Sequence, residues 1–71
     1  MQIHELYPPV KLYNQPAHTL DDAAYIIRQH ALMCGSLEEW KLGRRLRDAS
    51  SFIECESLEL RLRAWAQRTL Q

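Results

Sequence analysis

The chain contains few of the residues on which several common kinds of site depend. Among its 71 residues are two glycines and two cysteines, and its nine lysines and arginines are balanced by nine acidic residues. Two isolated glycines cannot form a glycine-rich phosphate loop, and a net charge of zero lacks the basic excess of a dedicated nucleic-acid-binding domain. No apolar run reaches the ~18 residues that a membrane-spanning helix requires. The composition therefore argues against all three of these classes.

The apolar content is sufficient for one small folded domain covering residues 1–71. Hydrophobic residues make up 46% and charged residues 25% of the chain, the balance of a globular protein and not of a disordered one. Domains this short often gain stability from a disulfide, a metal or a partner chain. Cys34 and Cys55 both fall in predicted helices, where a cysteine is usually a small buried residue. With free thiols and no secretory signal, we expect a cytoplasmic protein.

The N-terminal segment, residues 1–19, holds all three prolines. Two short runs of strand-forming residues, 10–13 and 17–20, flank a turn-like stretch at 14–16. Two structures fit this pattern: a small β-hairpin, or an irregular extended arm laid over the helices.

Residues 20–71 have the pattern of a compact three-helix bundle, so the fold class is expected to be mainly α. Their apolar residues recur at the spacing of helices. Gly43, inside the second helix, marks a close approach to another helix. The predicted helices span about 20–34, 37–54 and 57–70.

Capping residues set these boundaries. Thr19 precedes the first helix, and Gly35 ends it in the manner of a left-handed C-cap. Ser36 opens the second helix directly as the first residue of a capping box. For the third helix Ser57 is the favoured cap, and Ser51, three residues before a glutamate, is a competing one.

Each predicted helix has one apolar stripe for the core. The three stripes are, in chain order, Leu20, Ala23, Ala24, Ile27, Ala31 and Cys34; Leu42, Leu46, Ala49 and Ile53; and Leu58, Leu62, Trp65, Ala66 and Thr69. Further apolar residues fall outside these stripes, on faces that two other short helices do not obviously cover. They are Tyr25, Ile26, Leu32 and Met33 in the first helix, and Leu60 and Ala64 in the third.

This surplus has two interpretations. It disappears if the N-terminal arm covers Trp40 or the first helix with Ile3, Leu6, Tyr7 and Val10. Otherwise it forms a surface for another protein, because contiguous exposed apolar patches mark interaction sites. Trp40 lies almost opposite the core stripe of its helix, four residues from Arg44, at the spacing of a cation–π contact. The predicted partner-binding residues are Trp40, Leu37, Arg44, Arg47, Ile26 and Met33.

No constellation of residues indicates catalysis or metal binding. His30 and Cys34, four residues apart, provide two ligands, but a structural zinc needs four, and His4, His18 and Cys55 stand at unsuitable spacings. No order of serine, histidine and aspartate matches a known triad motif. We therefore expect a protein that is not an enzyme and that holds no metal or cofactor.

Two other functions stay open. A helix-turn-helix DNA-binding domain is the main alternative, since three short helices and a basic cluster at 41–47 permit one. However, acidic residues interleave with these cations, and the arginines of the second helix spread around its circumference. Nucleic acid is therefore not the expected partner. The remaining alternative is a structural homodimer.

Several segments resemble those of short helical proteins common in rhizobia and their relatives. They are Pro9-Val10 in an extended start, 19–24 (TLDDAA) opening a helix, 47–49 (RDA) and 62–66 (LRAWA). In size and helical character the chain also resembles the QseM type of small antiactivators of quorum-sensing-controlled conjugative elements, which bind a transcriptional activator and block it. The resemblance implies a protein partner of the transcription-factor class and identifies no binding residue. The expected function is a non-enzymatic regulator that docks on a partner protein and inhibits it.

Overall fold

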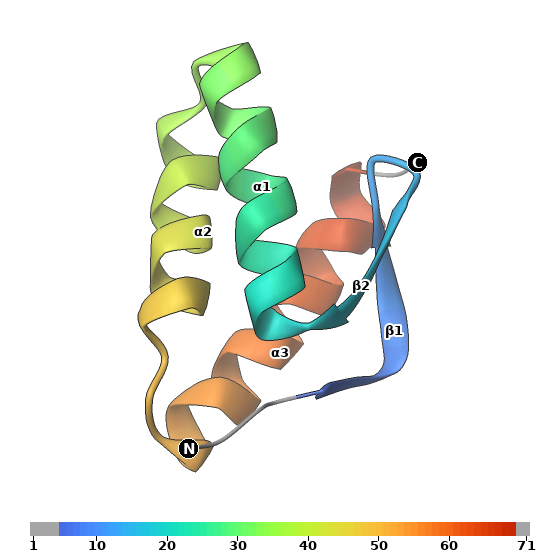
Figure 1. Ribbon diagram of the computed structural model, residues 1–71, viewed down its shortest axis with the longest axis vertical. Helices are drawn as coiled ribbons and strands as arrows, with labels where there is room; N and C mark the ends of the chain where they lie inside the picture. The colour runs from blue at the N-terminus through green and yellow to red at the C-terminus, as the bar shows by residue number, and fades with distance from the viewer. Residues whose placement is uncertain (1–4, 70–71) are drawn as a thin grey trace.

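The computed structural model describes residues 5–69, so the predictions for Ile3, for His4 and for residue 70 lie outside the described residues. A two-stranded antiparallel hairpin precedes three helices (Figure 1). This confirms a mainly helical fold and selects the hairpin over the irregular arm. The elements are β1 (Glu5–Leu12), β2 (Gln15–Thr19), α1 (Leu20–Cys34), α2 (Leu37–Asp48) and α3 (Phe52–Thr69).

The hairpin turns tightly at two residues. Tyr13 and Asn14 have φ angles of 50° and 68°, and two positive values in succession are what a type I′ turn needs. Leu12 pairs with Gln15 directly across this turn. The turn therefore begins one residue earlier than the predicted stretch at 14–16, because Asn14 tolerates a positive φ and the two-residue turn matches the twist of the strands.

The first helix begins and ends at the predicted residues, and the second begins at its predicted residue. The Thr19 hydroxyl accepts a hydrogen bond from the backbone N–H of Asp22 at 3.1 Å, and α1 follows it. At the other end Gly35 has a φ of 67°, the left-handed conformation that glycine adopts at low cost. The Ser36 hydroxyl then accepts from the N–H of Glu39 at 3.3 Å and starts α2.

The boundary between the second and third helices differs from the prediction. Helix α2 ends at Asp48 and not at residue 54. The Ser51 hydroxyl accepts a hydrogen bond from the N–H of Glu54 at 3.1 Å, so the competing cap is used and Ser57 lies inside α3. Ile53, predicted for the core stripe of the second helix, lies instead near the start of α3 and is 77% exposed.

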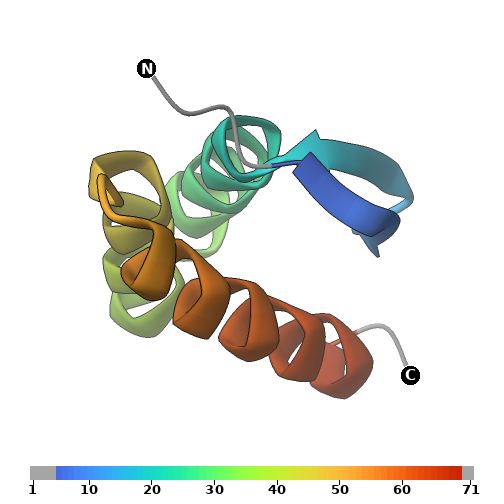
Figure 2. The same cartoon turned by 90° about the horizontal axis from the view of Figure 1, so that it is seen from below.

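Helices α1 and α2 form an antiparallel pair, and α3 passes behind them (Figures 1 and 2). The pair is in close contact at Gly43, as predicted. A Cβ atom at Gly43 would lie 2.6 Å from Cγ of Arg28 and 3.4 Å from the carbonyl oxygen of Ala24. The hairpin flanks α1 and α3 on the side away from α2.

The core lies where the hairpin, α1 and α3 meet. Its buried members are Leu6, Val10, Leu12, Ala17, Leu20, Ala23, Ala24, Ile26, Ile27, Leu46, Cys55, Leu58, Leu62, Trp65 and Ala66. Leu42 and Ala49 pack against it, partly buried, whereas Cys34 is exposed, contrary to its predicted place in the first stripe. Within residues 5–69, no helix combines the length and the apolar character needed to cross a membrane.

Candidate functional site

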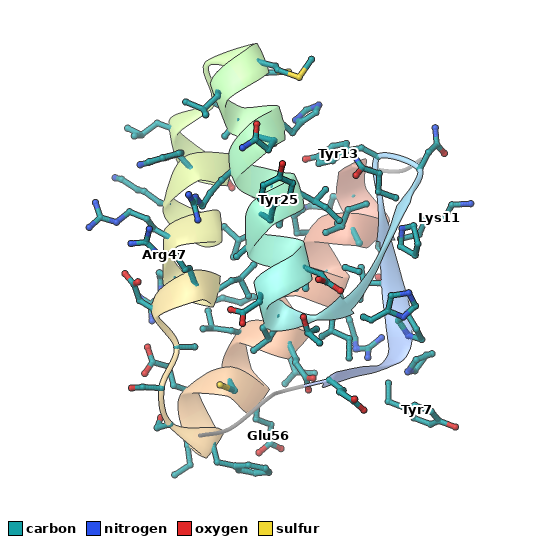
Figure 3. All side chains as sticks on the ribbon, viewed as in Figure 1. Tyr7, Lys11, Tyr13, Tyr25, Arg47 and Glu56 are labelled. Atoms are coloured by element: carbon teal, nitrogen blue, oxygen red, sulfur yellow. The ribbon has the colours of Figure 1, made fainter. Side chains whose placement is uncertain are left out.

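Large apolar side chains stay exposed on α1 and α2. Met33 is 84% exposed, and Leu32, Leu37 and Tyr25 are 67%, 64% and 62% exposed. Tyr25 and Leu32 are seven residues apart and share one face of α1, while Met33 and Leu37 flank the turn between the helices. We call these four residues the α1–α2 apolar surface; Figure 3 labels Tyr25 among them. Part of the predicted surplus is therefore exposed in the folded chain, including Tyr25, Leu32 and Met33. The predicted partner-binding residue Leu37 is exposed as well.

Trp40 is half-buried, and its cationic neighbour is not the predicted one. The guanidinium carbon of Arg28 lies 5.7 Å from the centre of the Trp40 ring. Arg28 comes from α1 and reaches this position beside Gly43, where α2 presents no side chain. A cation–π contact between the helices thus takes the place of the expected contact with Arg44 within α2.

The other predicted partner-binding residues separate into different environments. Ile26 is 7% exposed and belongs to the core, so its expected place on a surface strip is wrong. It shares this core with buried residues of the hairpin, which the helices alone would not supply. Arg44 is exposed, and Nε of Arg47 donates to Oδ1 of the adjacent Asp48 at 3.1 Å. Figure 3 shows Arg47 projecting from α2 on the side away from α1.

A chain of hydrogen bonds crosses the interior. The indole N–H of Trp65 donates to the hydroxyl of Tyr13 at 3.3 Å, and that hydroxyl donates to Oε2 of Glu39 at 2.8 Å. Nδ1 of His30 contacts the same carboxylate oxygen at 2.6 Å, and Sγ of Cys34 lies 3.5 Å from Nε2 of His30. The chain joins the hairpin turn to all three helices. Sequence reasoning noted His30 and Cys34 as neighbours but missed the chain, because Tyr13 and Trp65 are distant from them in sequence.

The carboxylate of Glu39 sets the direction of the hydrogen bonds that it receives in this chain. A carboxylate only accepts hydrogen bonds, so Nδ1 of His30 must carry a hydrogen. In the neutral ring Nε2 then has a free lone pair and accepts from the thiol of Cys34. The rings of Tyr13 and His30 stack at 3.7 Å with an interplanar angle of 7°. Glu39, only 7% exposed, is thereby buried with two donors.

The pKa of Tyr13 is raised to about 12, and burial is the largest cause. The hydrogen bond from Trp65 lowers the pKa in part, whereas the hydrogen bond to Glu39 and the negative charge of that carboxylate contribute to the increase. The phenol therefore stays protonated and keeps donating to Glu39 at all ordinary pH values. Its role is that of a fixed donor and not of a proton carrier.

The thiol of Cys34, the imidazole of His30 and the carboxylate of Glu39 follow one another in the order of a nucleophile, a base and an orienting acid. Acyl transfer also needs free N–H donors beside the thiol. The N–H groups of Gly35 and Ser36 both donate to the carbonyl of Ala31, at 2.7 and 3.2 Å. Neither is free to bind an oxyanion, the group whose stabilisation acyl transfer requires. Residues 5–69 contain no group of three or more His, Cys, Asp or Glu side chains that could hold a metal. What the arrangement supports is a fastening of the hairpin to the helices.

A groove of about 460 Å³ lies between α2 and α3. Leu42, Ala64 and Trp65 supply apolar surface to it, and charged side chains surround them. The charged lining residues are Glu38, Lys41, Arg45, Arg61 and Arg68. Four cations thus face one acid in a chain whose total charge is zero. We call this feature the basic groove.

The sequence carried a partial signal for the basic groove. Lys41 and Arg45 are four residues apart and share a face of α2, and Arg61 and Arg68 are seven apart and share a face of α3. Other residues, most of them uncharged, separate the members of each pair in the sequence, which conceals the pairing. That the two faces meet is decided only by the packing of the helices.

Comparison with known proteins gives no family assignment. No protein-family model matches the chain, and neither the curated proteins nor the solved structures include a match.

Proposed function

We propose that this chain is a non-enzymatic regulator that binds a partner protein and inhibits it by occupying one of its surfaces. The partner class implied by the resemblance to small antiactivators is a transcriptional activator. The observation that carries the proposal is the α1–α2 apolar surface, which stays in water although the core has closed.

The position of this surface supports the proposal. The hairpin covers the other flank of α1, so Leu6 and Val10 are buried while Tyr25 and Leu32 are not. Apolar surface left in water forgoes about 25 cal/mol for each Å² that could be buried. A partner that covers Tyr25, Leu32 and Met33 would recover this free energy. Tyrosine and methionine are also enriched at the centres of protein interfaces.

The neighbouring residues give the surface a polar border. Arg28 lies over the half-buried Trp40, and Arg44 is exposed further along α2. Interfaces commonly combine an apolar centre with a polar rim, and arginine is enriched there. In this proposal Met33 and Leu37 are the anchors, and Trp40 and Arg44 belong to the rim.

The test compares proteins captured from a lysate of the source organism by three versions of the full chain. One is the natural chain, one carries Met33→Lys with Leu37→Lys, and one carries Leu60→Lys. Leu60 on α3 is 68% exposed. It is therefore about as exposed as Met33 and Leu37, but it lies outside the α1–α2 apolar surface. We expect the natural chain and the Leu60→Lys control to retain a specific partner. The double substitution should lower the affinity for that partner at least ~10-fold, or by ~1.4 kcal/mol.

Two outcomes would contradict this proposal. One is a partner that binds all three versions equally, since the apolar surface would then have no part in binding. The other is self-association, measured by light scattering at two protein concentrations, that the double substitution abolishes. The surface would in that case join two copies of the chain and not a regulator to its target.

A further inference from the structure

We propose that the basic groove between α2 and α3 binds an acidic amphipathic helix of a partner protein. The inference shares with the proposed function the premise that the partner is a protein. It uses a different surface, however, and the two can fail separately.

The floor of the basic groove is apolar. Trp65 is only 8% exposed, and its indole N–H donates to Tyr13 in the interior at 3.3 Å. The polar edge of the ring is therefore turned away from the groove. Leu42, half-buried on α2, and Ala64, exposed on α3, complete the apolar lining. A groove between two helices with such a floor suits apolar residues spaced three and four apart on a third helix.

The rim of the groove selects for negative charge. Four of the nine cationic residues of the chain line the groove, whereas only one of its nine acidic residues does. Lys41 and Arg45 stand on α2, and Arg61 and Arg68 stand on α3, so cations lie on both sides of an occupant. An amphipathic helix with acidic flanks would place carboxylates against both rows while its apolar face meets the floor. Complementary charge of this kind favours specificity and rapid association.

The groove already holds a carboxylate of its own. Oε1 of Glu38 on α2 lies 3.7 Å from Nη2 of Arg68 on α3, and both side chains are well exposed. The guanidinium carbon of Arg68 in turn lies 5.1 Å from the centre of the Trp65 ring. Arg68 is thus positioned over the floor with a carboxylate beside it. An incoming acidic residue would take the place that Glu38 occupies.

The same details disfavour nucleic acid as the occupant. Single-stranded nucleic acid binds through bases stacked on exposed aromatic rings. The Trp65 ring is buried, and Arg68 lies over it.

The experiment measures the binding of a labelled synthetic peptide to the full chain by fluorescence anisotropy. The peptide has ~16 residues, enough for about four helical turns, with leucines on one face and glutamates on its flanks. A second peptide has the same leucines and lysines in place of the glutamates. We expect the acidic peptide to bind, more weakly as salt is raised, and the basic peptide not to bind.

Charge reversals at two neighbouring arginines provide a matched pair. Arg45 lines the groove and Arg44 does not, although both are exposed on α2. Arg45→Glu should lower the affinity for the acidic peptide at least ~5-fold, whereas Arg44→Glu should lower it by less than ~2-fold. Glu38→Gln should strengthen binding, because it removes the competing carboxylate. The double substitution at Met33 and Leu37 should leave peptide affinity unchanged, which separates this inference from the proposed function.

Four results would overturn the inference. The first is an equal loss of affinity for the acidic peptide with Arg44→Glu and with Arg45→Glu. The second is equal affinity of the chain for the acidic and basic peptides. The third is tighter binding of a single- or double-stranded oligonucleotide with the same dependence on Arg45. The fourth is self-association of the chain that Arg45→Glu abolishes. The occupant of the groove would then be a second copy of the chain, which would insert its exposed Ile53 and the neighbouring acidic residues.

Discussion

The hairpin and α2 flank the rest of the molecule on opposite sides, and they attach to it by different means. The hairpin buries four apolar side chains, Leu6, Val10, Leu12 and Ala17. Helix α2 is longer than either strand, yet its buried residues are Glu39, Gly43 and Leu46. The hairpin is thus held largely by apolar burial, whereas α2 is held by one buried leucine and a close contact at Gly43. The chain of hydrogen bonds through Tyr13 and Glu39 joins both to the rest of the molecule. The side with less apolar burial carries part of the basic groove and one residue of the α1–α2 apolar surface. In both of our proposals, α2 therefore contributes surface for binding more than it contributes core.

The largest effect in this comparison is expected from Leu12→Ala. Leu12 is fully buried, so its truncation should leave a cavity and lower the free energy of unfolding by about 3 kcal/mol. The matched control is Leu42→Ala on α2, which removes the same atoms from a half-buried position and should cost about 1 kcal/mol. Urea denaturation of both variants measures the difference. Equal losses would mean that the two sides are held in the same way.

A smaller effect is expected from Gly43→Ala. Alanine favours a helix over glycine by up to about 1 kcal/mol, but the added Cβ would lie 2.6 Å from Cγ of Arg28, near the root of that side chain. We expect the clash to outweigh the propensity and the free energy of unfolding to fall by about 1–2 kcal/mol. A stabilised variant in thermal denaturation would show that Arg28 moves aside freely and that the close contact is not required.

The smallest effect is expected from Tyr13→Phe, which removes a donor to Glu39 and an acceptor for Trp65. At neutral pH the loss should be about 1 kcal/mol. The pH dependence is more specific to this residue. The pKa of Tyr13 is about 12 when folded, above its ordinary value of 10. Its proton is therefore held more tightly in the folded chain than in the unfolded one.

The stabilisation linked to that pKa is complete below pH 10 and is lost as the pH rises through about 12. The natural chain should therefore lose stability over this interval, and the Phe variant should lose less of it. Denaturation curves at several alkaline pH values, taken as differences between the two proteins, isolate Tyr13 from other titrating groups. Parallel losses in both proteins would show that the phenol does not couple to folding.

The helix boundaries were foreseeable wherever one local signal stood alone. Thr19 and Gly35 bound α1 as predicted, because their capping bonds reach only three or four residues along the chain. Ser51 and Ser57 presented two caps close together, and periodicity alone could not choose between them. The choice of Ser51 moved Ile53 out of the predicted stripe of the second helix. The apolar positions of α3 from Leu58 to Ala66 were correct, since helical spacing alone defines that face.

The candidate sites were foreseeable only in part. Exposure of Met33 and Leu37 followed from their helical positions outside the core stripes. The burial of Ile26 did not follow, because it belongs to a core completed by hairpin residues, and the hairpin could not be distinguished from a loose arm. The partner of Trp40 was also missed. Arg28 is far from Trp40 in sequence and meets it only because Gly43 lets the helices approach.

The sequence by itself determined three amphipathic helices, their local caps and an excess of apolar side chains over what they could bury. These properties depend on neighbours a few residues away, and so they can be read along the chain. The tertiary structure alone decided the chain of hydrogen bonds from Trp65 to Cys34 and the charge of the groove. Both arise where faces of different elements meet, so a chain with no net charge presents a strongly basic groove once α2 and α3 are packed together.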